Sequence, residues 1–254
     1  MRSFANLAYA DHNAALNTVN VYLPDEGDSF PVFLYFHGGG LIHSNGSIGR
    51  FPFVQYLTDH GIAVVGASYR LYPICKGERN VQFPDFLVDA ADAVNWVKTN
   101  ISKYCHMEKL IVGGSSNGAF LSAMLCFDKQ WLGAHDISPL DIDGFIHDAP
   151  QLTTHFSVLE KKGLSTKRVI IDEAAPLYYV GVEKEYPNML FINAQNDGHT
   201  RLSQTKLACT ALKNLGHGDK VQSVVLPGTH CAYVNAPEQD FGKLILDFIQ
   251  NNKK

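Results

Sequence analysis

The five residues Gly114-Ser-Ser-Asn-Gly118 constrain the fold of this chain more than any other segment. They lie between an apolar run that predicts a strand, 109–114, and a run of small apolar residues that predicts a helix, 116–128. Glycines two positions before and after the central residue allow a strand and a helix to approach closely through a strained turn. Ser116 is then expected at the carboxyl end of a buried strand and at the head of a helix. Ser115 does not fit this frame, because no glycine stands two places after it.

This pattern alone is weak evidence for a catalytic serine, because it arises by chance in roughly one chain in ten of this composition. In such chains it marks only a turn, so a second motif is needed to support a catalytic role. The motif is His37-Gly-Gly-Gly40, directly after the apolar run 31–36. Glycines in such a loop can turn backbone N–H groups inward with no side chain in the way. We expect the N–H groups of Gly39, Gly40 and Asn117 to form an oxyanion hole. For His37 we expect a structural role.

The later part of the chain offers a carboxylate and a histidine in matching positions. Asp197 follows the strand predicted at 188–194, in a turn that Gly198 closes. His230 follows the strand predicted at 221–226 and precedes the last amphipathic helix. These are our candidate acid and base. The candidates that we consider less well placed are Asp148, Asp172 and Glu173 for the acid, and His199 and His217 for the base.

The pattern along the chain predicts an α/β fold, with a mostly parallel central sheet and helices on both of its faces. The predicted strands are 18–23, 31–36, 61–67, 109–114, 142–147, 188–194 and 221–226. The predicted helices are 49–59, 84–100, 116–128, 200–214 and 237–250. We expect one domain over 1–254, with residues 150–187 as a small cap insertion within it.

Composition excludes several classes of function. The formal net charge of −4 gives no basic footprint for nucleic acid, and no apolar run is long enough to cross a membrane. The N-terminus lacks the apolar core of a signal peptide, so we expect a cytoplasmic protein. Five scattered cysteines without a C-x-x-C pair predict free thiols and no metal site. These are residues 75, 105, 126, 209 and 231.

Together these motifs resemble the α/β-hydrolase family, specifically the hormone-sensitive-lipase-like esterases and small bacterial carboxylesterases. The segment Ser68-Tyr-Arg-Leu-Tyr-Pro73 adds to the resemblance, whereas Asn117 departs from it, since the family usually has alanine there. The resemblance implies hydrolysis of carboxylic esters without a cofactor. In that reaction Ser116 is the nucleophile, His230 the base and Asp197 the residue that orients the base.

The resemblance also indicates the substrate, which we expect to be a small-molecule ester with a short acyl group or a small aryl or sugar part. Few residues precede the glycine loop, and 150–187 lacks the broad apolar face of a lipid-binding lid. A homodimer is possible.

Two alternatives remain open. An arylformamidase or related amidase shares the fold and the three residues, but typically has an aromatic residue within the glycine loop, where this chain has a third glycine and then Leu41. A non-catalytic ligand-binding protein of the same fold usually lacks a member of the triad.

Overall fold

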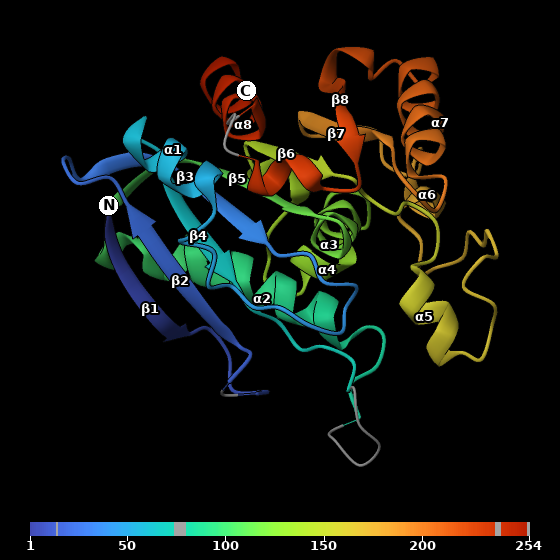
Figure 1. Ribbon diagram of the computed structural model, residues 1–254, viewed down its shortest axis with the longest axis horizontal. Helices are drawn as coiled ribbons and strands as arrows, with labels where there is room; N and C mark the ends of the chain where they lie inside the picture. Colours follow the sequence, from blue (N-terminus) through green and yellow to red (C-terminus); the bar gives the residue numbers. More distant parts are fainter. Residues whose placement is uncertain (14, 74–79, 237–239, 253–254) are drawn as a thin grey trace.

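The computed structural model describes residues 1–13, 15–73, 80–236 and 240–252, and its centre is one eight-stranded sheet (Figure 1). The strand order is β1-β2-β4-β3-β5-β6-β7-β8. Neighbouring strands from β4 to β8 pair in parallel, whereas β2 is antiparallel to both β1 and β4. The strands are β1 (Arg2–Ala8), β2 (Thr18–Leu23), β3 (Ser29–Phe36), β4 (Ala63–Ala67), β5 (His106–Ser115), β6 (Gly144–Asp148), β7 (Met189–Asn196) and β8 (Val221–Thr229).

Helices cover both faces of this sheet. On one face α1 and α8 pack against each other and share a buried apolar cluster with the strands. On the other face α2, α3 and α7 contribute to a second cluster. The long helices are α1 (Pro52–Asp59), α2 (Asp85–Asn100), α3 (Asn117–Phe127), α7 (Arg201–Asn214) and α8 (Asp240–Asn251).

The remaining helices are short. They are α4 (Gln130–Gly133), α5 (Phe156–Lys161) and α6 (Pro176–Tyr179), with the 3₁₀ turns η1 (Ile101–Lys103), η2 (Pro139–Asp141), η3 (Gly218–Lys220) and η4 (Ala232–Asn235).

The central strands explain why the chain folds in this order. All five residues of β4 and of β6 are buried, as a strand with helices on both faces requires. Because β5, β7 and β8 run in the same direction, the loops that follow Ser115, Asn196 and Thr229 leave the sheet at the same edge. That edge carries the candidate site.

The α/β class and the mostly parallel sheet are confirmed, and each predicted strand and long helix has its counterpart. The structure adds β1, an exposed edge strand that carries no alternating apolar pattern and has an irregular register between Phe4 and Leu7. It also adds the short helices α4, α5 and α6, whose lengths are below what helical periodicity reveals.

Cysteine use agrees with expectation in the described part of the chain, where Cys105, Cys126, Cys209 and Cys231 are free thiols. Cys75 lies outside the described residues, and so do the first residues, 237–239, of the last predicted helix. None of the described helices is both long and apolar enough to span a bilayer.

Candidate active site

The turn between β5 and α3 has the strained geometry that its glycines predict. Ser116 adopts φ 58° and ψ −116°, and its N–H donates to the carbonyl oxygen of Asp148 at 2.8 Å. A Cβ at Gly114 or at Gly118 would overlap the backbone of Phe36. The two glycines are therefore required for β3, β5 and α3 to approach as they do. The turn presents a half-buried Ser116 at the sheet edge.

Ser116, His230 and Asp197 form one continuous chain of hydrogen bonds. The Nε2 atom of His230 lies 2.8 Å from Ser116 Oγ, and its Nδ1 atom lies 2.9 Å from Asp197 Oδ1 and 3.0 Å from Oδ2. The Asp197 side chain is 1% exposed, whereas that of His230 is 37% exposed. The carboxylate is therefore shielded, while the imidazole and the hydroxyl remain open to a ligand.

The other carboxylates that the sequence offered lie elsewhere. Asp172 accepts from Thr154 Oγ1 at 2.6 Å and pairs with Lys162 at 3.4 Å. Asp148, at the end of β6, is fully buried and accepts from the Tyr233 hydroxyl at 2.5 Å. Of these acids, only Asp197 contacts the imidazole of His230.

Burial raises the pKa of Asp148 from its usual 3.8 to about 6. Between about pH 4 and pH 6 the folded state therefore binds this proton while the unfolded state releases it, so stability falls as pH rises. The variant Asp148→Asn keeps an acceptor for Tyr233 and lacks the titration. We expect the unfolding free energy of the wild type to fall by about 2 kcal/mol relative to this variant between pH 4 and pH 6. Urea unfolding of both proteins at pH 4, 5 and 6 measures these free energies. A difference between wild type and variant that does not change with pH would contradict the prediction.

The glycine loop departs from expectation at Gly40. Its N–H donates to the side-chain Oδ1 of Asn117 at 2.7 Å, so this N–H is engaged with the protein. The Nδ2 atom of Asn117 donates to the hydroxyl of Tyr69 at 2.5 Å, and that hydroxyl donates to the carbonyl oxygen of His37 at 2.6 Å. In this arrangement Gly40 holds the loop to α3. The signal for this role was Asn117 itself, a polar side chain at the point where the loop meets the helix.

The N–H groups of Gly39 and Asn117 remain the candidate donors. Asn117 is the first residue of α3, ahead of the first helical hydrogen bond, which Phe120 donates to the carbonyl oxygen of Ser116. Gly39 adopts φ 124°, and its carbonyl oxygen accepts from the N–H groups of Ile42 and His43. The loop is thus closed on itself beside Ser116.

His37 has the structural role that was expected. It is 2% exposed, and its ring stacks on Tyr69 with the ring centroids 4.3 Å apart. Burial lowers the pKa of His37 to about 4, so the ring is neutral at physiological pH. The buried, stacked ring of His37 therefore supports the glycine loop.

Two cavities flank the Ser116–His230 pair. The first cavity, of about 270 Å³, has Tyr35, Phe51 and Val234 in its wall. The second cavity, of about 480 Å³, is lined by Ile42, Phe156, His199 and Arg201 among others. Phe156 is the part of segment 150–187 that reaches the second cavity. A substrate bound at Ser116 therefore has room on both sides of the reacting atoms.

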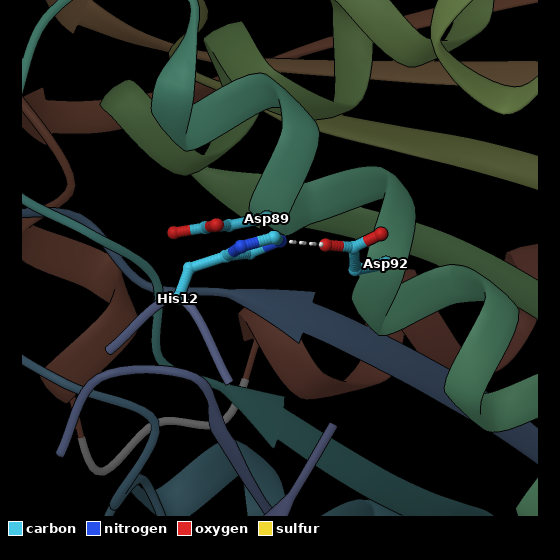
Figure 2. A group of neighbouring side chains, drawn as sticks. All are labelled: His12, Asp89 and Asp92. Atoms are coloured by element: carbon cyan, nitrogen blue, oxygen red, sulfur yellow. Dashed lines mark hydrogen bonds and ion pairs between the residues drawn. The ribbon is translucent and has the colours of Figure 1, made fainter. Parts of the chain in front are cut away.

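In the part of the chain that the structure describes, one group of side chains has metal-ligand atoms close together: His12, Asp89 and Asp92 (Figure 2). His12 Nε2 lies 3.0 Å from Asp92 Oδ2. Asp89, however, already accepts from the Nε and Nη2 atoms of Arg70, at 2.9 and 2.7 Å, and from its backbone N–H. The positive guanidinium opposes a second cation there. This group is an ion-pair network that ties the N-terminal loop and Arg70 to α2.

Comparison with known proteins agrees with this architecture. The BD-FAE family model matches residues 19–137, and the model of the prolyl oligopeptidase family matches residues 79–254. Phenmedipham hydrolase of Pseudarthrobacter oxydans is 28% identical over 114 residues, which are 42% of this chain and 22% of that protein. The 3-O-acetylpapaveroxine carboxylesterase CXE1 of Papaver somniferum is 31% identical over 160 residues, which are 58% of this chain and 46% of that one. The chain spans less than half the length of these two relatives.

Solved structures resemble nearly the whole chain. A thermophilic esterase from Thermogutta terrifontis superposes with a TM-score of 0.77 at 20% identity, covering 97% of this chain and 91% of that one. A truncated carbohydrate esterase from gut microbiota superposes with a TM-score of 0.72 at 17% identity, covering 99% of this chain and 97% of that one. These likenesses concern the fold. Because a family model matches well over half of the chain and agrees with the sheet and its Ser116 turn, the chain belongs to the prolyl oligopeptidase family of α/β-hydrolases.

Proposed function

We propose that this protein is a serine carboxylesterase. The observation that supports the proposal most is the continuous hydrogen-bonded chain from Asp197 through His230 to Ser116, with the serine on a strained turn. Such an arrangement activates a hydroxyl as a nucleophile. Two relatives in sequence are named as carboxylesterases, and a solved structure with the same fold is named as an esterase.

In the proposed reaction, Ser116 Oγ forms a bond with the ester carbonyl carbon while His230 Nε2 takes the hydroxyl proton. Asp197 holds the other ring nitrogen and stabilises the imidazolium. The tetrahedral intermediate then expels the alcohol, which leaves with the proton from His230. Water attacks the acyl-enzyme in the same way and releases the carboxylic acid and Ser116.

The oxyanion of each tetrahedral intermediate would lie against the N–H groups of Gly39 and Asn117. The Gly40 N–H is engaged with the Asn117 side chain and so contributes through the shape of the loop. Two preorganised backbone donors, one in the glycine loop after β3 and one at the head of α3, provide the charge stabilisation that acyl transfer needs.

We expect Gly39→Ala to lower kcat by about 10²- to 10³-fold, the usual loss for one oxyanion donor. Its Cβ would overlap the carbonyl oxygen of His43, and the residue would keep an unfavourable positive φ, so the loop must shift. Kinetics with 4-nitrophenyl acetate measure the effect, and circular dichroism verifies that the variant is folded. A folded variant with wild-type kcat would contradict the role of Gly39.

The size of the two cavities favours short acyl groups. Volumes of about 270 and 480 Å³ suit small molecules, and the polar side chains of His199 and Arg201 in the wall of the larger cavity disfavour a long apolar chain there. We expect hydrolysis of 4-nitrophenyl acetate and butyrate at least tenfold faster than that of the palmitate, without activation at a lipid interface. A preference for long-chain emulsions would contradict this substrate class and leave the roles of the three residues intact.

The ester assay also separates the alternatives. An arylformamidase or amidase would turn over an aryl formamide faster than the matched aryl ester. A non-catalytic binding protein would hydrolyse neither, and Ser116 would not react with a fluorophosphonate probe. Labelling of Ser116 together with faster ester turnover is the result that the proposal predicts.

A further inference from the structure

A third cavity extends the second one away from Ser116. It measures about 240 Å³, and His199 belongs to the walls of both cavities. Two exposed basic residues of segment 150–187, Lys167 and Arg168, line it together with threonine and glutamine side chains. The second and third cavities therefore adjoin at His199, with the reacting serine in the wall of one and a basic rim on the other.

A buried guanidinium lies in the wall of the second cavity. Arg201, at the start of α7, is 2% exposed and lines the second cavity. Its Nη1 atom donates to the carbonyl oxygen of Ala149 at 2.8 Å, while its buried Nε has no hydrogen-bond partner and lies 3.7 Å from Asp197 Oδ1. The Nε atom is enclosed by the protein and faces the carboxylate that contacts His230, so Asp197 provides the counter-charge of this buried cation.

The charges around the second and third cavities do not balance. Arg201, Lys167 and Arg168 carry positive charge, and Asp197 is the only carboxylate among the described residues that line the two cavities. Asp197 pairs with Arg201, whereas Lys167 and Arg168 form no ion pair with any described residue, so their two positive charges remain uncompensated. The first turn of α7 also lacks an acidic residue, so its positive dipole end is uncompensated. This concentration of positive charge occurs in a protein of net charge −4.

We propose that the second and third cavities form a subsite for a carboxylate carried at the far end of the ester substrate. The Arg168 guanidinium at the rim presents paired donors that match a carboxylate, and Lys167 adds a second positive charge that attracts it from solution. The subsite rests on the proposed ester hydrolysis, and it narrows the substrate class to anionic esters. The carboxylate can belong to the acyl part or to the alcohol part, because His230 borders both flanking cavities.

Two pairs of esters that differ in charge test the proposal. For the acyl part, the pair is 4-nitrophenyl hydrogen glutarate and 4-nitrophenyl pentanoate. For the alcohol part, it is 3-carboxyphenyl acetate and phenyl acetate. The variant is Lys167→Ala/Arg168→Ala, and the control is Lys98→Ala/Lys243→Ala, which removes the same charge from exposed positions on α2 and α8.

In one of the two pairs we expect the double variant at 167 and 168 to lose at least tenfold in kcat/KM for the anionic ester, mainly through KM. Its activity on the neutral ester should stay within twofold of wild type, and the control should behave as wild type on both. The advantage of the anionic ester should also decline from 20 to 500 mM NaCl, because salt screens the exposed rim.

An anionic-to-neutral ratio that is unchanged in the double variant for both pairs would overturn the subsite, while neutral-ester turnover would still support the proposed function. If the wild type hydrolysed no ester, the proposed function would be wrong, and calorimetry with glutarate would test the subsite by itself. Binding of glutarate that the double variant loses and the control keeps would support the subsite. Absence of binding to the wild type would overturn it.

Discussion

Ser116→Ala is expected to lower kcat for 4-nitrophenyl butyrate by about 10⁴- to 10⁶-fold, as loss of a triad nucleophile does elsewhere. The variant removes one hydroxyl, whose partner is His230 at 2.8 Å, and leaves the backbone of the turn unchanged. We therefore expect its thermal midpoint to stay within a few degrees of wild type. Stopped assays at high enzyme concentration measure the residual rate.

The neighbouring serine is the matched control. Ser115 is 3% exposed, and its Oγ accepts from the hydroxyl of Tyr35 at 2.8 Å. Ser115→Ala should cost stability through this buried contact and leave kcat within about tenfold of wild type. If Ser115→Ala abolished activity and Ser116→Ala did not, the frame in which the turn was interpreted would be wrong.

Asp197→Asn is expected to lower kcat by about 10⁴-fold, the size of the loss when a triad aspartate is amidated. The carboxylate accepts the Nδ1 proton of His230, and an amide at this position favours the wrong tautomer. It also leaves Arg201, whose Nε lies 3.7 Å from Asp197 Oδ1, without its counter-charge. The expected result is a large loss in kcat with a smaller loss in unfolding free energy, which denaturant titration measures separately.

Asp172→Asn provides the comparison for that variant. Asp172 bonds to Thr154 and Lys162 in segment 150–187 and has no contact with His230. We expect it to retain kcat within a few-fold of wild type. If Asp172→Asn lowered kcat more than Asp197→Asn did, our assignment of Asp197 as the orienting carboxylate would be wrong.

Much of the fold followed from local patterns. The continuous apolar runs predicted the strands of a sheet covered on both faces, and the pairs of glycines around Ser116 predicted the tight turn. Chain order then restricted the acid and the base, because parallel strands bring the loops after β5, β7 and β8 to one edge. The three residues chosen on that ground are those that the structure brings within hydrogen-bond distance of one another.

Other features were not accessible from local patterns. The edge strand β1 is exposed along most of its length, so burial leaves no periodic signal in its sequence. The bond between Gly40 and the Asn117 side chain joins residues 77 positions apart, and the polar residue at 117 gives a signal for such a bond without specifying its partner. The sequence therefore predicted the Gly40 N–H as an oxyanion-hole donor, whereas in the structure it donates to the Asn117 side chain.

The sequence by itself determined the class of sheet, the strained turn and the residue types available for acyl transfer, because each depends on neighbours in the chain. Only the tertiary structure decided which carboxylate meets His230 and where the cavities lie. It also decided that Arg201 is buried beside the second cavity and paired with Asp197. The physical reason is that hydrogen bonding and desolvation act over a few ångströms of space, between side chains that the sheet brings together from distant parts of the chain.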